Sequence, residues 1–265
     1  MQIKKFSWLF TLAIALVVAM NVLVTACGGG NADTAGGPQK LVMGTSADYP
    51  PYEYRDTAGG KNEIIGFDVD IAKYITKQLN YTLEISDMDF NGLLPALQTK
   101  RVDFVMAGMT PTEERKQSVE FTDIYFEAKN TIIALKGSKL IKVENLVGKQ
   151  VGVQLGSIQE SEMKETAEKV KGINLKPLNK IGDLIQEIKS KRLDAAIVED
   201  TVAKGYVAAN PELEFNVIPS EGPSGSAIAF PKGSTLVKPF NDALKQMKDK
   251  GEIETLVKKW FDREA

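Results

Sequence analysis

The sequence alternates short apolar runs with stretches of helical periodicity, and this alternation limits the fold more than any other feature of the chain. Lys40 to Thr45, Tyr81 to Ile85 and Asp103 to Ala107 are typical of strands. Between them, Asp68 to Leu79 and Leu93 to Gln98 carry apolar residues at helical spacing. A strand–helix–strand–helix–strand run predicts a parallel sheet covered by helices.

The same pattern occurs a second time, without a close repeat of the sequence itself. Strand and helix patterns alternate over Gln150–Val153, Ser157–Val170, Ile173–Pro177, Ile181–Lys189 and Leu193–Val198. Two such units in series predict an α/β protein with two lobes, each a mainly parallel sheet flanked by helices.

Two connecting segments suggest how the lobes are joined. Asn130 to Leu135 is β-branched and lies between the units, and Val217 to Phe230 follows the second unit and is rich in Pro, Gly and Ser. A chain that passes twice between lobes forms a two-strand hinge, and the helical tail Leu236 to Phe261 then returns to the first lobe. We therefore predict lobe 1 at 40–128 plus 226–265, lobe 2 at 129–225, and hinges near 127–131 and 219–226.

The first residues predict export. Lys4 and Lys5 precede an almost entirely apolar stretch, Leu9 to Val24, which small residues follow; this is the pattern of a secretory signal. The alternative is a signal anchor that stays in the membrane, but the run is shorter than the roughly 20 apolar residues of a comfortable span. Val24-Thr25-Ala26-Cys27 resembles the bacterial lipobox, which implies cleavage before Cys27 and a diacylglycerol on its thiol.

We therefore expect a signal peptide over 1–26, a lipidated Cys27 with a flexible tether over 27–39, and an extracytoplasmic protein anchored to the outer face of the cell membrane. Cys27 is the only cysteine, so an internal disulfide is impossible.

Composition excludes several kinds of function. The chain has no histidine, which removes the commonest general base, the usual metal ligand and every Ser-His-Asp or Cys-His arrangement. We expect neither a metal site nor a cofactor. Loss of Lys4 and Lys5 with the signal peptide changes the formal net charge from −2 to −4, and no basic block stands out, so nucleic acid is not an expected partner.

Four motifs follow predicted strands. Arg115 lies in the first turn of a helix that Thr112 is expected to cap. A cation is slightly unfavourable at this end of a helix dipole, which suggests a function. The planar guanidinium of Arg115 matches the two oxygens of a carboxylate. The alternative is a surface arginine paired with Glu113 or Glu114. The turn Gly152 to Ser157 permits close backbone approach and offers a hydroxyl, although a simple capped helix start explains it equally.

The other two motifs offer aromatic rings and carboxylates. Tyr49 lies in a loop stiffened by two prolines and Phe90 follows the next strand; their faces could enclose a flat or cationic group, or simply pack the loop. The strand Leu193 to Val198 ends in Glu199 and Asp200, of which Asp200 is expected to cap the next helix and leave Glu199 freer. Strand ends of this kind meet in one crevice, which would then hold an anion site, a cation site and aromatic walls, as a zwitterionic amino acid requires.

Four segments resemble a known family in the expected order: Gly66-Phe67-Asp68-Val69-Asp70-Ile71-Ala72, Thr110 to Arg115, Gly152 to Ser157, and Leu193 to Glu199. They are similar to the signatures of family 3 bacterial solute-binding proteins, the amino-acid receptors of ABC importers. The resemblance covers Lys40 to the end and implies the type II periplasmic-binding-protein fold, closure about a hinge, and a membrane permease as partner.

The resemblance also implies residue roles. Arg115, helped by Thr110 and Ser157, would hold the ligand carboxylate. Glu199, with Asp200 as the alternative, would hold the ammonium, Gly108 would offer its backbone, and Tyr49 and Phe90 would stack on the ligand side chain. The other expected ligand-binding residues are Ser46, Glu53, Ala107, Gln154, Ile158 and Gln159.

Within the family, the chain most resembles the arginine, lysine and histidine binders, because aromatic walls and the nearby carboxylates of Asp48, Glu53 and Glu160 suit a cationic side chain. Ser46 stands where some such binders have Asp. Glutamine is the alternative ligand. A dehydratase-like enzyme on the same fold and a lipoprotein that has lost transport are the other hypotheses; we expect no enzyme.

Overall fold

The computed structural model describes residues 38–57, 61–219 and 225–262. The predicted signal peptide, Cys27 and all but the last two residues of the predicted tether lie outside the described residues, as does part of the second predicted hinge.

The first lobe is built on a five-stranded sheet with the order β5-β1-β6-β13-β7. Its strands are β1 (Gln39–Thr45), β5 (Tyr81–Asp87), β6 (Phe104–Val105), β7 (Val119–Phe121) and β13 (Ala229–Pro231). β1 pairs in parallel with β5 and β6, and β13 is antiparallel to both its neighbours. The helices of this lobe are η3 (Phe90–Gly92), α2 (Phe67–Gln78), α3 (Leu93–Gln98), α4 (Glu113–Ser118), α8 (Val237–Asp249) and α9 (Glu252–Trp260).

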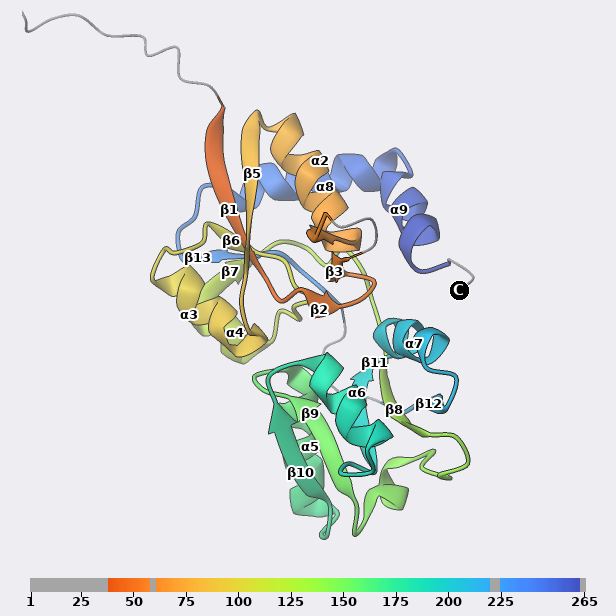
Figure 1. The fold of residues 1–265 in the computed structure, drawn as a ribbon. Coiled ribbons are helices and arrows are strands. Elements are labelled where there is room, and N and C mark those ends of the chain that lie inside the picture. Colours follow the sequence, from red (N-terminus) through yellow and green to blue (C-terminus); the bar gives the residue numbers. More distant parts are fainter. Residues whose placement is uncertain (1–37, 58–60, 220–224, 263–265) are drawn as a thin grey trace, which may run out of the picture. The chain divides into compact units, whose positions relative to one another are not determined.

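The second lobe repeats this plan with the order β10-β9-β11-β8-β12 (Figure 1). Its strands are β8 (Asn130–Leu135), β9 (Gln150–Gln154), β10 (Asn174–Leu178), β11 (Ala195–Glu199) and β12 (Leu213–Val217). β10, β9 and β11 are parallel, and β8 runs antiparallel between β11 and β12. The helices are η4 (Val143–Leu146), α5 (Ile158–Lys169), α6 (Ile181–Lys189) and α7 (Asp200–Ala209).

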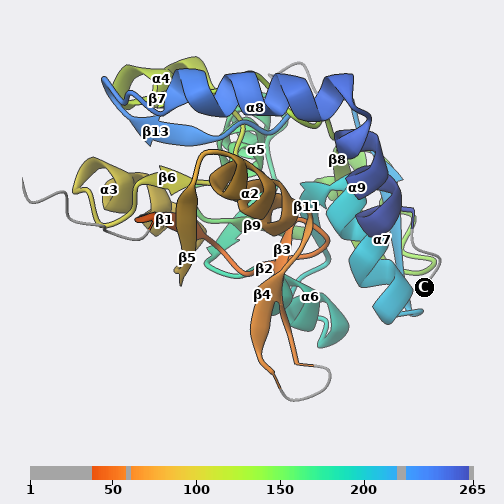
Figure 2. The same cartoon turned by 90° about the horizontal axis from the view of Figure 1, so that it is seen from above.

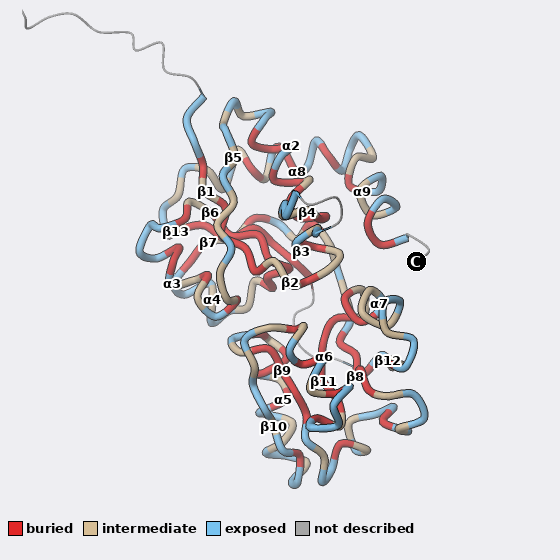
Figure 3. Tube along the Cα trace, in the orientation of Figure 1, coloured by how far each residue is buried: buried red, intermediate tan, exposed pale blue. Residues whose placement is uncertain are grey.

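The central strands of both sheets are largely buried and are red in Figure 3. Successive strand residues point to opposite faces, so Phe104 and Val105 of β6 enter different core clusters, as do Ala196 and Ile197 of β11. α6 buries one face of apolar residues, and Leu184 and Ile188 on this face are fully buried. The expected two-lobe α/β fold is confirmed.

The C-terminal helices pack against the first sheet. α8 runs alongside β13 (Figure 2), and the ring of Phe240 lies 5.0 Å from that of Phe230 and 5.1 Å from that of Phe104. The tail therefore completes the core of the lobe in which the chain began.

One local prediction was wrong, and one small sheet was missed. The strand expected over Asp103 to Ala107 covers only Phe104–Val105, because the chain turns away at Gly108, which has a φ of 56°. A small sheet of β2 (Asp48–Tyr49), β3 (Glu53–Asp56) and β4 (Glu63–Ile65) was not predicted, since strands of two to four residues carry too little alternation to recognise.

Candidate functional site

A narrow cavity lies between the two lobes, and the space free of protein atoms there, open solvent included, is about 240 Å³. The first lobe contributes one part of its wall and the second lobe the other. The lining residues are Tyr49, Phe90, Ala107, Gly108, Thr110, Arg115, Gln154, Ser157, Ile158, Gln159 and Glu199. All of them belong to the set expected from the sequence, and the structure brings them together in one place.

The position of the cavity follows from the topology. Gln154 and Glu199 end β9 and β11, and Phe90 and Ala107 follow shortly after β5 and β6. The carboxyl ends of parallel strands meet at one edge of a sheet, so side chains that follow different strands converge there. Each lobe turns this edge toward the cavity.

Arg115 is a half-buried cation that forms no salt bridge with a described residue. Thr112 caps α4 as predicted, because its Oγ1 accepts a hydrogen bond from the N–H of Arg115 (3.2 Å). The guanidinium donates from Nη1 to the carbonyl of Thr110 (2.8 Å) and from Nη2 to that of Gly156 in the other lobe (2.9 Å). Burial lowers the pKa of Arg115 to about 10. The charge of Glu114 opposes this lowering, but neither Glu113 nor Glu114 forms a salt bridge with Arg115.

The environment of Arg115 leaves donors for a ligand. Each terminal nitrogen of a guanidinium carries two N–H groups, so Nη1 and Nη2 each retain one N–H beyond the bonds to the carbonyls of Thr110 and Gly156. Phe90 covers one face of the group, with the ring centre 5.6 Å from Cζ.

Glu199 is the complementary group. It is 5% exposed, and its Oε2 has no hydrogen-bond partner among the described residues. Burial raises the pKa of Glu199 to about 8, an effect that the hydroxyls of Tyr52 and Tyr49 partly offset. A cation bound beside this buried carboxyl would favour its ionised form and form an ion pair with it.

Asp200 does not share this role. Its Oδ1 accepts hydrogen bonds from the N–H groups of Lys129 (3.1 Å) and Thr201 (2.9 Å), and it is absent from the cavity wall. The expectation that Asp200 occupies the cap position was also wrong, since α7 begins at Asp200 and Glu199 precedes it as N-cap. The carboxylate of Asp200 binds the backbone, whereas that of Glu199 faces the cavity.

The second lobe presents the start of α5. Ser157 caps this helix by accepting from the N–H of Glu160 (3.1 Å), and its hydroxyl donates to the carbonyl of Gln154 (2.7 Å). Gly156 has a φ of 79°, and a Cβ placed there would lie 3.0 Å from Cβ of Asn91 in the first lobe. The glycine therefore permits both the turn and the close approach of the lobes. Gln159 is held by Asn130, to whose Oδ1 its Nε2 donates (2.9 Å).

Two expected residues do not line the cavity. The hydroxyl of Ser46 donates to Oδ1 of Asp48 (2.9 Å). Glu53 is fully buried, and neither of its carboxylate oxygens receives a donor among the described residues. Burial, followed by the carboxylates of Asp68 and Asp48, raises the pKa of Glu53 well above its ordinary value. Glu53 is therefore a neutral core group on the buried side of β3.

The carboxylates expected to favour a cationic side chain are engaged elsewhere. Glu160 accepts from the N–H of Gly156 (2.7 Å) and pairs with Lys164 (2.7 Å), and neither Asp48 nor Glu53 reaches the wall. Among the described residues, Glu199 is the carboxylate that the cavity wall contains.

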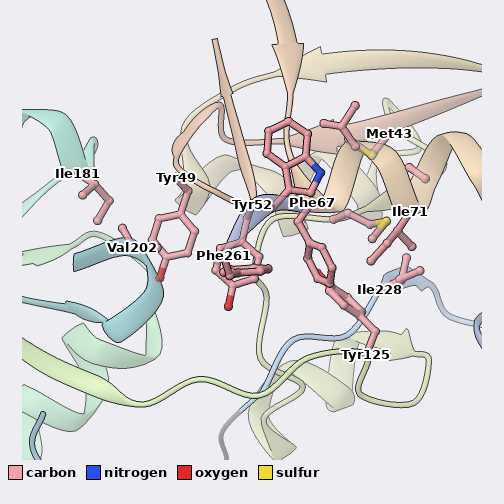
Figure 4. Close-up of a cluster of buried hydrophobic side chains, with 14 of the residues drawn as sticks. Met43, Tyr49, Tyr52, Phe67, Ile71, Tyr125, Ile181, Val202, Ile228 and Phe261 are labelled. Carbon is pink, nitrogen blue, oxygen red and sulfur yellow. The ribbon is translucent and has the colours of Figure 1, made fainter. Parts of the chain in front are cut away.

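Sequence reasoning missed a supporting layer behind the cavity. Asp68 of α2 accepts hydrogen bonds from the N–H of Gly108 (3.0 Å) and the hydroxyl of Tyr125 (2.8 Å), which fixes the Gly108 turn. Tyr49 stacks on Tyr52 with ring centres 5.5 Å apart. Figure 4 shows the ring of Tyr49 beside Ile181 and Val202 of the second lobe. Asp68 lies in the segment Gly66 to Ala72 that resembles the family signature, but the sequence alone assigned this carboxylate no role.

The part of the chain that the structure describes contains no group of three or more acidic, Cys or His side chains placed to hold a metal ion. It also contains no helix long and apolar enough to cross a membrane.

Two α/β lobes around a polar cavity, with an arginine from one that no described residue holds in a salt bridge and a glutamate from the other, define a solute-binding protein of the periplasmic type. The chain belongs to the bacterial extracellular solute-binding proteins, family 3, whose sequence profile matches residues 41–263. Membership places it among proteins that work outside the cytoplasm, and the resemblance noted in the sequence is confirmed.

Individual relatives agree with this assignment. The arginine-binding extracellular protein ArtP of Bacillus subtilis is 49% identical over 259 residues, which cover 97% of this chain and 98% of the relative. Two structures of an ancestral arginine-binding protein, one bound to arginine and one to glutamine, are each 40% identical and cover 84% of this chain and 98% of theirs. Their TM-scores are 0.78 and 0.77.

Proposed function

We propose that the chain is the receptor of an ABC importer and captures a cationic amino acid, arginine before lysine and histidine, between its lobes. One observation carries this proposal: a half-buried guanidinium that forms no salt bridge with a described residue, Arg115, and a buried carboxyl without a described cationic partner, Glu199, line the same cavity. Burying either group alone is costly, and a zwitterion compensates both at once.

Arg115 binds the α-carboxylate of the ligand through the donors that Thr110 and Gly156 leave unused. Ser157, on the facing lobe, adds its hydroxyl by turning the proton from the carbonyl of Gln154 to the ligand. Glu199 binds the α-ammonium, and the backbone at Gly108 supplies a further acceptor. The two charged groups of the ligand are thus divided between the lobes.

The aromatic walls favour a cationic ligand side chain. Tyr49 and Phe90 line the cavity, and a guanidinium or ammonium over an aromatic face gains about 0.5–2 kcal/mol. The names of ArtP and of the arginine-bound ancestral protein support arginine. The glutamine-bound form of the same ancestral protein keeps glutamine as the second candidate, because a neutral amide fits the same space.

Closure about the hinge couples binding to transport. We assign 40–128 plus 226–265 to lobe 1 and 129–225 to lobe 2, with the chain crossing near 127–131 and 219–226. Only the closed arrangement brings Arg115 and Glu199 onto one ligand, so the ligand shifts the equilibrium toward it. The membrane permease then recognises the closed receptor.

A lipid on Cys27 holds the receptor at the outer face of the membrane in this proposal. The chemistry of the anchor predicts that the mature protein partitions into detergent and that a Cys27→Ser variant does not. Equal partitioning of both proteins would exclude it.

The relatives are solute-binding proteins, and we propose that this chain likewise returns its ligand unchanged. A dehydratase-like activity would instead produce a new compound from a bound cyclic acid, which mass spectrometry of the released ligand would detect.

Calorimetry with arginine tests the site. We expect Arg115→Ala to weaken binding by about 2–5 kcal/mol, because the ligand carboxylate loses its charged partner in a buried position. Arg101→Ala is the matched control, since Arg101 is exposed and does not line the cavity. Unchanged affinity in the Arg115 variant would refute the assignment.

A further inference from the structure

A second set of contacts joins the lobes outside the ligand cavity, at the start of α6. Oδ2 of Asp48, from β2 in the first lobe, accepts a hydrogen bond of 2.6 Å from the N–H of Ile181, the first residue of α6 in the second lobe. Neither residue lines the ligand cavity.

α6 has no cap of its own. Its N-cap residue is Lys180, whose side chain makes no capping hydrogen bond. Lysine is a poor choice there, because it supplies no acceptor and adds positive charge where the helix dipole is already positive. The carboxylate of Asp48 provides both the acceptor and the negative charge that this end of the helix lacks.

The surroundings strengthen the contact. Nζ of Lys180 lies 3.2 Å from Oδ1 of Asp89 and 3.8 Å from Oδ1 of Asp48, both in the first lobe. The hydroxyl of Tyr206 on α7 donates to the carbonyl of Asp48 (3.0 Å), and Nδ2 of Asn179 donates to Asp89 (2.9 Å). Asp48 therefore receives second-lobe donors at both its side chain and its backbone.

We propose that Asp48 caps α6 from the opposite lobe, and that this interlobe cap stabilises the closed receptor and slows ligand release without contacting the ligand. The inference rests on the proposed hinge closure. When the lobes separate, the N–H of Ile181 and the carboxylate of Asp48 return to water, so the cap contributes only to the closed state. It therefore adds the same increment to every ligand that closes the protein.

The test uses the full chain in detergent with Asp48→Ala and Asp48→Asn. Lys189→Met is the matched control, because Lys189 is on the same helix and pairs with Glu212 within the second lobe (3.2 Å). Arginine dissociation is followed by stopped flow, and hydrogen exchange is followed at the amide of Ile181.

We expect Asp48→Ala to speed arginine dissociation about 2- to 30-fold, as the loss of an N-cap implies, with little change in association. Asp48→Asn, which keeps an acceptor, should recover part of this effect, and Lys189→Met should have none. The ratio of arginine to glutamine affinity should stay constant. If Asp48 contacted the ligand side chain, its substitution would change this ratio.

Unchanged dissociation in Asp48→Ala, or a changed arginine-to-glutamine ratio, would overturn the proposal. The exchange measurement separates this failure from failure of the proposed function. If the unaltered protein binds no amino acid, the function is wrong. Faster hydrogen exchange at the amide of Ile181 in Asp48→Ala than in Lys189→Met would then still establish that Asp48 caps α6. Equal exchange rates in the two variants would refute it.

Discussion

At the scale of single residues, the neighbours Glu199 and Asp200 have different fates although the sequence presents them alike. Asp200 is held by two backbone N–H groups, whereas Oε2 of Glu199 lacks a partner and its pKa rises to about 8. Which of the two carboxylates faces the cavity depends on the backbone geometry at the start of α7. The sequence does not specify this geometry, so it left both residues as candidates for the ammonium.

The raised pKa predicts that binding releases protons. In the closed arrangement without a cation, the carboxyl of Glu199 is mostly protonated near pH 7, and a bound ammonium favours its ionised form. Below about pH 8, binding should therefore release up to one proton, and the apparent affinity should rise with pH until about 8 and then level off. Calorimetry in buffers of different ionisation enthalpy measures the release directly.

Glu199→Gln is the control for this prediction, since an amide has no proton to lose in this range. The variant should bind more weakly and release none at the same pH. Proton release of equal size in both proteins would assign it to another group, of which Asp68, with a pKa raised to about 6, is the nearest candidate behind the cavity.

Glu53 and Ser46 show the limit of sequence reasoning at this scale. Both follow the first strand, as cavity residues do, but Glu53 lies on the buried side of β3 and Ser46 binds Asp48. β2 and β3 are too short to recognise from alternation, so the side on which each residue falls could not be known beforehand.

At the scale of elements, the long periodic helices were predicted well. α6 has the predicted bounds, and α5 begins one residue after its predicted cap, Ser157. Amphipathic spacing and a capping residue fix such helices locally. What the sequence did not indicate is that the cap of α6 comes from the other lobe, because that contact depends on how the lobes meet.

The turn between β9 and α5 provides a prediction about closure of the two lobes. A Gly156→Ala substitution places a methyl group 3.0 Å from Asn91 across the cleft, at a φ of 79°. We expect closure to be obstructed and arginine affinity to fall at least tenfold, or about 1.4 kcal/mol or more. Calorimetry measures the affinity, and thermal unfolding without ligand measures stability.

Gly137→Ala is the matched control. Gly137 has nearly the same φ, 77°, but an added Cβ meets nothing within 4 Å. Both variants share the backbone strain, on the order of 1 kcal/mol, so both should lose similar stability. Only Gly156→Ala should lose affinity, and equal affinity in the two variants would contradict the close approach described here.

At the scale of the whole molecule, the described residues of the two lobes share one buried cluster. Tyr49 of the first lobe and Ile181 and Val202 of the second belong to it (Figure 4). Phe126, which precedes β8, stacks on Phe261 near the end of the chain with ring centres 4.4 Å apart. The sequence predicted two lobes from a repeated pattern, but these contacts join segments far apart in the chain and have no local signal.

The central claim concerns the ligand, and calorimetric titration of the protein with arginine, lysine, histidine and glutamine tests it most directly. The account predicts one site per chain, with arginine bound most tightly, lysine and histidine next, and glutamine more weakly. Absence of binding to all four, or tighter binding of glutamine than of arginine, would contradict it.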